Sequence, residues 1–278
     1  MNIDPERFID LVVKGESLRI AYAVRPGTGR PLLFIHGMGS SRWAFLPQLQ
    51  AMHVENPLYA LDLPGFGGST LPRVRQQVGD FVLAVLGFVE TAELERPVLV
   101  GHSFGGLVAA ESAISAPARI AGTVLAASAG WCVPEGAFEP TPWVWVNRLG
   151  IWLTSTNWVG HRILSGLGVD PSQLTKQDRR RLRYGWRRAR EMARMGRFYH
   201  TERMAERLQA AGVPTVVIAG RADRLFPLPK VIQGVGGRFP LWVMESGGHL
   251  VLDQDRATFL DLLERAVIRV QAGPSPTK

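Results

Sequence analysis

One glycine-rich turn in the chain joins an apolar run to a segment of helical length: Gly101-His102-Ser103-Phe104-Gly105-Gly106. The run before it, Val-Leu-Val at 98–100, predicts a buried strand, and the small apolar residues after it predict a helix. G-x-S-x-G between a strand and a helix is the pattern of a nucleophile elbow, a sharp turn that lifts a serine hydroxyl above a sheet. We therefore predict that Ser103 is a nucleophile. The alternative is a strand–helix turn with a bystander serine.

Two further residues can complete this chemistry, because a serine hydroxyl is a weak nucleophile without a base. His249 lies between the last strand-like run and the final helix, at the sheet edge where ligands bind in α/β folds. Asp223 follows the apolar run 214–219, from which a carboxylate can reach His249 and hold its tautomer. The order serine, aspartate, histidine is the one expected for an elbow serine. Asp253 is the alternative acid, and a turn or helix-cap role is the alternative for Asp223.

Two backbone amides are expected to bind the oxyanion of a tetrahedral intermediate. The amide of Phe104 opens the helix after Ser103, where the helix dipole favours negative charge. The second donor is expected from the loop His-Gly-Met-Gly-Ser at 36–40, whose glycines permit a tight path. The candidate donor in this loop is the amide of Met38.

The apolar pattern predicts an α/β fold. Residues 8–14 and 17–24 resemble two strands joined at Gly15-Glu16, which predicts an antiparallel hairpin. Continuous apolar runs, typical of parallel strands buried on both faces, lie at 31–35, 57–61, 97–100, 123–127, 214–219 and 240–244. Segments with helical length or spacing lie at 74–91, 104–116 and 259–270. This alternation of strands and helices predicts a mostly parallel sheet.

One segment, residues 133–208, breaks the alternation, because it contains no clear strand-like run. It contains several tryptophans and an arginine-rich stretch, Arg179–Arg190, whose arginines recur at helical spacing. We predict a helical cap at 133–208, inserted into a core formed by 1–132 and 209–278. The basic helix face is either solvated or a site for an anionic substrate or acidic lipid. Nucleic-acid binding is not expected, since no recognition motif accompanies the charge.

Composition limits the remaining possibilities. The chain has 278 residues, a net charge of +8 and a single cysteine, Cys132, so an internal disulfide is excluded. The first residues lack the basic and apolar regions of a signal peptide, and no run is long enough to span a membrane, so we expect a cytoplasmic protein. The histidines and carboxylates lack metal-ligand spacing, and neither a metal nor another cofactor is expected.

Taken together, the motifs resemble those of the α/β-hydrolase family along nearly the whole chain. The matching segments, in chain order, are 36–39, the stretch DLPGFGGS at 62–69, the Ser103 elbow, the turn 220–223 and Gly248-His249. The resemblance implies the α/β-hydrolase fold, with a mostly parallel central sheet, helices on both faces and an inserted helical cap that covers the site. It also implies supporting roles for His36, His102 and Asp62.

The resemblance narrows the chemistry as well. Relatives that open epoxides or dehalogenate alkanes carry an aspartate at the elbow, where this chain has Ser103. We expect a serine hydrolase, similar to esterases and lipases, that cleaves carboxylic esters of small to medium apolar substrates without a cofactor. The alternatives are a carbon–carbon bond hydrolase or a perhydrolase with the same triad, or a ligand-binding protein without turnover.

Overall fold

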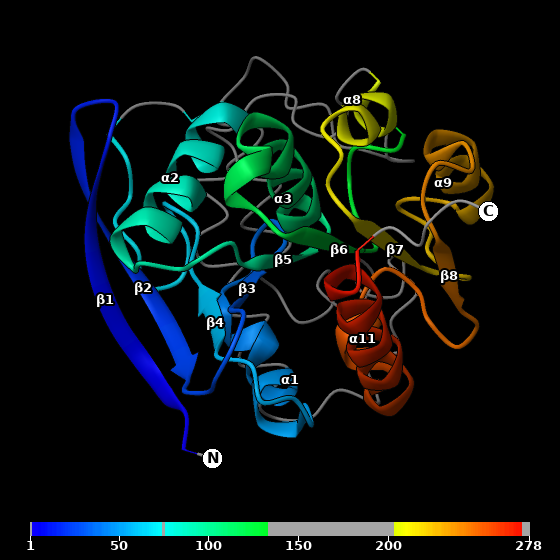
Figure 1. Cartoon of the computed structure of the whole chain (residues 1–278), viewed down its shortest axis with the longest axis horizontal. Coiled ribbons are helices and arrows are strands. Elements are labelled where there is room, and N and C mark those ends of the chain that lie inside the picture. The colour runs from blue at the N-terminus through cyan, green and yellow to red at the C-terminus, as the bar shows by residue number, and fades with distance from the viewer. Residues whose placement is uncertain (1, 74–75, 133–202, 274–278) are drawn as a thin grey trace, which may run out of the picture.

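An eight-stranded sheet forms the centre of the structure (Figure 1). The structure is a computed structural model that describes residues 2–73, 76–132 and 203–273. The strands follow the order β1-β2-β4-β3-β5-β6-β7-β8 across the sheet. Their bounds are β1 (Asp4–Val13), β2 (Glu16–Arg25), β3 (Leu32–Ile35), β4 (Leu58–Leu61), β5 (Val98–His102), β6 (Gly122–Ala126), β7 (Thr215–Gly220) and β8 (Leu241–Met244).

The strand pairing confirms the predicted mostly parallel sheet. β1 pairs antiparallel with β2, and β2 with β4, whereas all the pairs among β4, β3, β5, β6, β7 and β8 are parallel. The predicted hairpin is present, but its turn lies at Lys14 and Gly15, one residue before the expected Gly15-Glu16. The φ angles of Lys14 and Gly15, 51° and 79°, are both positive. A two-residue turn with two positive φ angles matches the twist of the strands that it joins.

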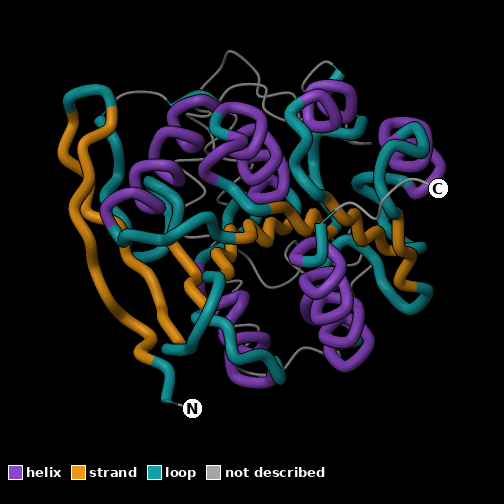
Figure 2. Tube along the Cα trace, in the orientation of Figure 1, coloured by secondary structure: helices purple, strands orange, loops and turns teal. Residues whose placement is uncertain are grey.

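Helices cover both faces of the sheet, as predicted (Figure 2). Figure 1 shows α2, α3 and α8 over one face and α1 and α11 over the other. The helices are α1 (Leu46–Ala51), α2 (Val78–Thr91), α3 (Phe104–Ser115), α8 (Met204–Ala210), α9 (Leu228–Val235), α10 (Val251–Gln254) and α11 (Arg256–Gln271), with short 3-10 turns η1 (Arg42–Phe45) and η2 (Pro117–Arg119). None of the helices in the described ranges combines the length and apolar character that a membrane span requires.

Two hydrophobic clusters, one on each face, explain the continuous apolar runs. In β3, Leu33 and Ile35 belong to the cluster under α2 and α3, whereas Leu32 and Phe34 belong to the cluster over α1 and α11. Successive side chains of a strand point to opposite faces. A strand covered on both faces therefore needs an apolar residue at every position.

The start of α2 differs from the prediction. The apolar spacing predicts a helix from residue 74, but α2 begins at Val78, after residues 74–75, which lie outside the described ranges. The backbone N–H of Gln77 donates to the Asp80 carboxylate at 2.8 Å, and the Gln77 side chain completes a capping box. A hydrogen-bonded cap of this kind defines a helix start that apolar spacing does not reveal.

Helix α8 packs on the core beside α3, the helix that follows Ser103. Its Arg207 donates two hydrogen bonds to Glu111 of α3, at 2.9 and 2.7 Å. Met204 and Leu208 are buried in the cluster under α3. The predicted cap boundary at residue 208 falls inside this helix, and residues 133–202 of the predicted cap, with the Arg179–Arg190 stretch, lie outside the described ranges.

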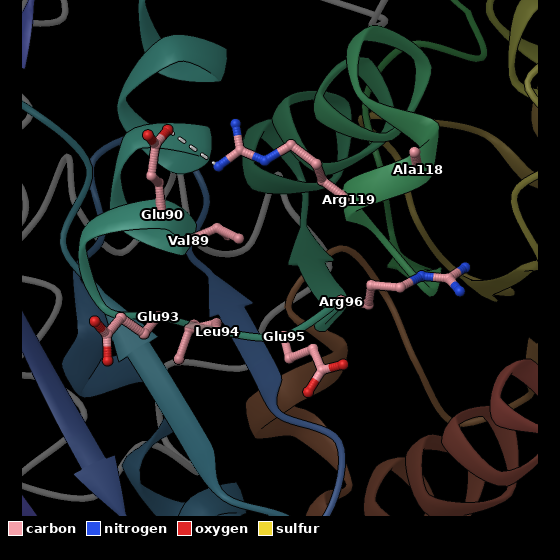
Figure 3. Close-up of a pocket in the computed structure, with 8 residues that line it drawn as sticks. All are labelled: Val89, Glu90, Glu93, Leu94, Glu95, Arg96, Ala118 and Arg119. Atoms are coloured by element: carbon pink, nitrogen blue, oxygen red, sulfur yellow. Dashed lines mark hydrogen bonds and ion pairs between the residues drawn. The ribbon is translucent and has the colours of Figure 1, made fainter.

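A hollow of about 320 Å³ lies between the carboxyl end of α2 and the segments that lead into β5 and β6 (Figure 3). Charged side chains line it, and Arg119 pairs with Glu90 at 3.3 Å. Because these segments precede parallel strands, the hollow opens at the amino edge of the sheet. Ser103 follows β5 at the opposite edge, so the hollow is separate from the candidate site.

Candidate active site

Ser103 occupies a strained turn between β5 and α3. Its φ and ψ angles are 53° and −120°, a conformation that residues with a side chain rarely adopt. The flanking glycines have no room for a side chain. A Cβ at Gly101 would lie 2.4 Å from the Gly105 carbonyl oxygen, and one at Gly105 would lie 2.1 Å from the Ile35 carbonyl oxygen. The predicted strand–turn–helix therefore requires glycine on both sides of the serine.

The end of β6 supports the backbone of Ser103. The Ser103 N–H donates to the Ala126 carbonyl, and the Ser103 carbonyl accepts from the Ala129 N–H, both at 3.0 Å. Ala127 lies between these two partners and has a φ of 42°. Hydrogen bonds on both sides of Ser103 over-determine the turn, which is how a strained conformation persists in a folded protein.

Ser103, His249 and Asp223 form one hydrogen-bonded chain. His249 Nε2 lies 3.0 Å from Ser103 Oγ, and His249 Nδ1 lies 3.0 Å from Asp223 Oδ2. All three residues are buried. They come from the segments that follow β5, β8 and β7, whose carboxyl ends lie at the same edge of the sheet. The arrangement can deprotonate the serine hydroxyl and stabilise the resulting imidazolium.

Both oxygens of the Asp223 carboxylate have hydrogen-bond partners. Its Oδ1 atom accepts hydrogen bonds from the N–H groups of Leu225 and Phe226, at 2.8 and 2.9 Å, while Oδ2 faces His249. The turn-forming role and the role behind the histidine are therefore compatible, although the sequence presented them as alternatives. The other candidate acid, Asp253, lies on α10 and pairs with Arg256 at 3.4 Å.

The segment that carries His249 is held by a contact that sequence reasoning missed. The Gly248 N–H donates to the side-chain oxygen of Gln254, at 2.6 Å. On its other side, a Cβ at Gly220 would lie 2.3 Å from the Gly248 carbonyl oxygen, so the loop packs directly on the end of β7. Gln254 follows His249 by five residues on α10, but no motif marks this contact in the sequence.

The predicted oxyanion loop lies against the nucleophile. A Cβ at Gly37 would lie 3.0 Å from Ser103 Cβ, so a larger residue there would crowd the serine. Met38, the next residue, is partly buried against the cluster under α3. Phe104 is the first residue of α3. The structure thus brings the segment that contains Met38 and the start of the Phe104 helix to the same serine, as the two-donor prediction requires.

The buried ring of His36 supports the neighbouring loops through two hydrogen bonds. The His36 ring accepts the Leu63 N–H at Nε2, at 3.0 Å, and its Nδ1 lies 2.8 Å from the Gly37 carbonyl oxygen. Burial lowers the pKa of His36, which favours the neutral tautomer that these two contacts require.

A buried arginine, which the sequence did not single out, organises the loop of Asp62. The Asp62 carboxylate accepts from the Arg42 side chain and backbone, and from the Gly68 N–H at 2.7 Å. Arg42 also donates to Glu6, at 3.0 Å, and thereby links β1 to this loop. Both members of the Arg42–Asp62 pair are almost fully buried.

His102, the residue before the nucleophile, makes folding sensitive to acid. Burial, together with the nearby His249, lowers the pKa of His102 to about 3, from an ordinary value of 6.5. Between these values the unfolded chain binds a proton here that the folded chain does not, so the free energy of unfolding falls as the pH falls.

For His102→Gln, which removes this titration, we expect the loss of unfolding free energy between pH 7 and pH 5 to be smaller than in the wild type by about 2 kcal/mol. Urea unfolding of both proteins at the two pH values measures the difference. Equal losses in the two proteins would contradict the neutral, buried state of His102.

Within residues 2–73, 76–132 and 203–273, no three or more His, Cys, Asp or Glu side chains form a group that could hold a metal ion. The described part of the site offers a nucleophile, a base and an acid. These groups can support covalent and acid–base catalysis by side chains.

The sequence is similar to those of known hydrolases and an acyltransferase. A family model described as the alpha/beta hydrolase family matches residues 32–262. The chain is 30% identical over 161 residues to 1-acylglycerol-3-phosphate O-acyltransferase ABHD5 of Rattus norvegicus, a match of 54% of this chain and 45% of that protein. It is 33% identical over 99 residues to (E)-2-((N-methylformamido)methylene)succinate hydrolase of Acinetobacter baylyi, covering 36% of this chain and 38% of that protein. Both matches span less than half of the relative.

Solved structures resemble the chain over nearly its whole length. A thermophilic esterase from Thermogutta terrifontis superposes with a TM-score of 0.75 at 19% identity, covering 95% of this chain and 99% of that one. Carboxylesterase CesB from Bacillus subtilis superposes with a TM-score of 0.76 at 15% identity, covering 97% and 93%. At these identities the likeness is one of fold.

Proposed function

The chain belongs to the alpha/beta hydrolase family, and we propose that it is a serine hydrolase that cleaves carboxylic esters through an acyl-enzyme. One observation carries the proposal: His249 Nε2 lies 3.0 Å from Ser103 Oγ, and His249 Nδ1 lies 3.0 Å from Asp223 Oδ2. Ser103 itself lies on a strained turn that leaves no room for a side chain at Gly101 or Gly105. A nucleophile, a base and an orienting carboxylate at hydrogen-bonding distance are the parts that acyl transfer needs.

In the proposed mechanism, Ser103 Oγ attacks the ester carbonyl while His249 Nε2 takes its proton. Asp223 stabilises the imidazolium that forms and keeps the proton of Nδ1 directed away from the serine. His249 then gives its proton to the leaving alcohol, which completes the acyl-enzyme. Water attacks the acyl-enzyme with His249 as base, and the carboxylic acid is released.

Oxyanion stabilisation is assigned to the backbone amides of Met38 and Phe104. The close approach of the Gly37 backbone to Ser103 supports the first donor, and the position of Phe104 at the start of α3 supports the second. Donors that are fixed before the reaction stabilise a developing charge without reorganisation. Removing one such donor typically lowers kcat by about 10²- to 10³-fold.

Small to medium apolar esters are the proposed substrates. The esterases among the similar structures support ester chemistry, and the predicted cap at 133–208, with its tryptophans, is the proposed selector of the acyl group. No cofactor takes part in the proposed reaction.

The proposal is tested by hydrolysis of p-nitrophenyl esters from acetate to palmitate, together with fluorophosphonate labelling and mass mapping of the adduct. We expect turnover, a preferred chain length, and a single adduct on the peptide that contains Ser103. An adduct on another peptide would refute the assignment of Ser103. A labelled Ser103 without ester turnover would favour carbon–carbon hydrolysis or peracid formation. A folded protein with neither labelling nor ester turnover would favour ligand binding.

A further inference from the structure

His102 contacts the catalytic base through the base's own backbone. It is the last residue of β5 and is buried directly beside Ser103. Its Nε2 atom lies 2.9 Å from the carbonyl oxygen of His249, and the centroids of the two rings are 5.4 Å apart. A carbonyl oxygen can only accept a hydrogen bond, so His102 must carry its proton on Nε2.

The other side of the His102 ring faces the oxyanion loop. A Cβ at Gly37 would lie 3.2 Å from His102 Nδ1 and 3.0 Å from Ser103 Cβ. The His102 ring therefore touches the loop that carries Met38 on one side and the segment that carries His249 on the other. The side chain of His102, the residue before Ser103, thus lies between the loop that carries Met38 and the segment that carries His249.

The His249 side chain is bonded to Asp223 and Ser103, and the Ala222 N–H donates to the Gly247 carbonyl at 2.8 Å. Two side-chain contacts from the following helices hold residues before His249. Gln254 binds the N–H of Gly248, and the hydroxyl of Ser246 donates to Asp255 at 2.8 Å. Both contacts come from the α10–α11 side and act before His249 in the chain. The bond from His102 acts on His249 itself and ties it to β5, the strand that also carries Ser103.

The charge state of His102 suits this position. During catalysis His249 becomes an imidazolium, and a second cation at the distance of His102 would oppose that change. Burial keeps His102 neutral, as its lowered pKa indicates. The residue therefore supplies a hydrogen-bond donor close to the base without adding a competing charge.

We propose that His102 is a positioning residue, which fixes the distance between His249 and Ser103 by donating its Nε2–H to the His249 carbonyl. This inference rests on the proposed function, in which that distance governs proton transfer. A displacement of about 1 Å in a catalytic group can lower the rate about 10²-fold. The role is distinct from packing, because it depends on a donor at one particular atom.

Three variants separate the donor from the packing. Glutamine places an amide N–H near the position of histidine Nε2, asparagine carries the same group one methylene short, and phenylalanine keeps a ring without a donor. For His102→Gln we expect kcat within about threefold of the wild type. For His102→Asn and His102→Phe we expect kcat to fall by about 10- to 100-fold, with KM changed less than about twofold.

The concentration of active sites is determined by titration with a fluorophosphonate, and kcat is calculated from that concentration. Unfolded protein therefore does not lower the measured kcat. A second readout needs no substrate: the downfield proton resonance of His249 Nδ1–H, hydrogen-bonded to Asp223. It should be kept in His102→Gln and shifted or broadened in His102→Asn. If His102→Asn fails to fold, His102→Phe supplies the donor-free comparison.

The outcomes distinguish this inference from the proposed function. Equal kcat in the asparagine and glutamine variants, or a glutamine variant as impaired as the phenylalanine variant, would overturn the positioning role while leaving the esterase proposal intact. If the wild type cleaves no ester, the esterase proposal fails, and the Nδ1–H resonance alone decides the role of His102. An unchanged resonance in all variants would then overturn it.

Discussion

Replacing Ser103 by alanine is expected to lower kcat for ester hydrolysis by about 10⁶-fold, to the residual rate that binding and the oxyanion amides supply. The alanine variant keeps the turn and the β6 hydrogen bonds to the backbone of residue 103, so its fold should be unchanged. His249→Ala should cause a loss of similar size, because without the base at 3.0 Å the serine hydroxyl remains protonated.

The double variant provides the strict test of a shared mechanism. If Ser103 and His249 act as one unit, Ser103→Ala combined with His249→Ala should lose no more activity than either single variant. Initial rates on the preferred p-nitrophenyl ester, at enzyme concentrations high enough to detect the residual rate, measure this. Multiplicative losses would show that the two residues act independently, against the hydrogen-bonded chain in the structure.

A matched pair of aspartates identifies the acid. Asp223→Asn should lower kcat by about 10⁴-fold, because an asparagine amide favours the wrong tautomer of His249. Asp253→Asn makes the same chemical change at the alternative acid, on α10, where the carboxylate faces Arg256. Its kcat should stay within about threefold of the wild type. The reverse ranking of the two variants would assign the acid role to Asp253.

The sequence predicted those parts of the structure that depend on local pattern and on strand order. Unbroken apolar runs marked the parallel strands, since a strand covered on both faces must be apolar throughout. Asp223 and His249 each followed such a run, and parallel strands end at one edge of a sheet, so both residues were expected near Ser103. Local chain chemistry and a topological rule were together sufficient to place the candidate site.

The contacts between distant segments could not be predicted in this way. Arg42 looks like a surface residue in its segment, yet it is buried against Asp62, twenty residues later. The bond from His102 to the His249 carbonyl joins residues 147 positions apart. Such pairs depend on how two loops meet after the sheet has formed, and neither partner carries a periodic or spacing signal.

Replacing Asp62 by asparagine is expected to lower the free energy of unfolding by about 3–5 kcal/mol, the typical cost of breaking a buried ion pair. The side chains of Arg42 and Asp62 are only 1% and 0% exposed. The variant leaves the Arg42 guanidinium buried with Glu6 as its remaining carboxylate partner, and the Glu6 side chain is 59% exposed. A buried charge that loses its partner retains the full cost of its desolvation. Urea unfolding, followed by two probes to verify a two-state transition, measures the change.

An exposed ion pair of the same residue types provides the control. Arg265 and Asp261 on α11 lie 3.1 Å apart with both side chains more than 60% exposed, so Asp261→Asn should change the free energy of unfolding by less than about 0.5 kcal/mol. Arg42→Met completes a double-mutant cycle with Asp62→Asn. Because the second substitution removes the charge that the first left unpaired, the double variant should lose less stability than the sum of the single variants. Additive losses, or a loss in Asp62→Asn no larger than in Asp261→Asn, would mean that the buried pair does not hold the loop 62–69 in place.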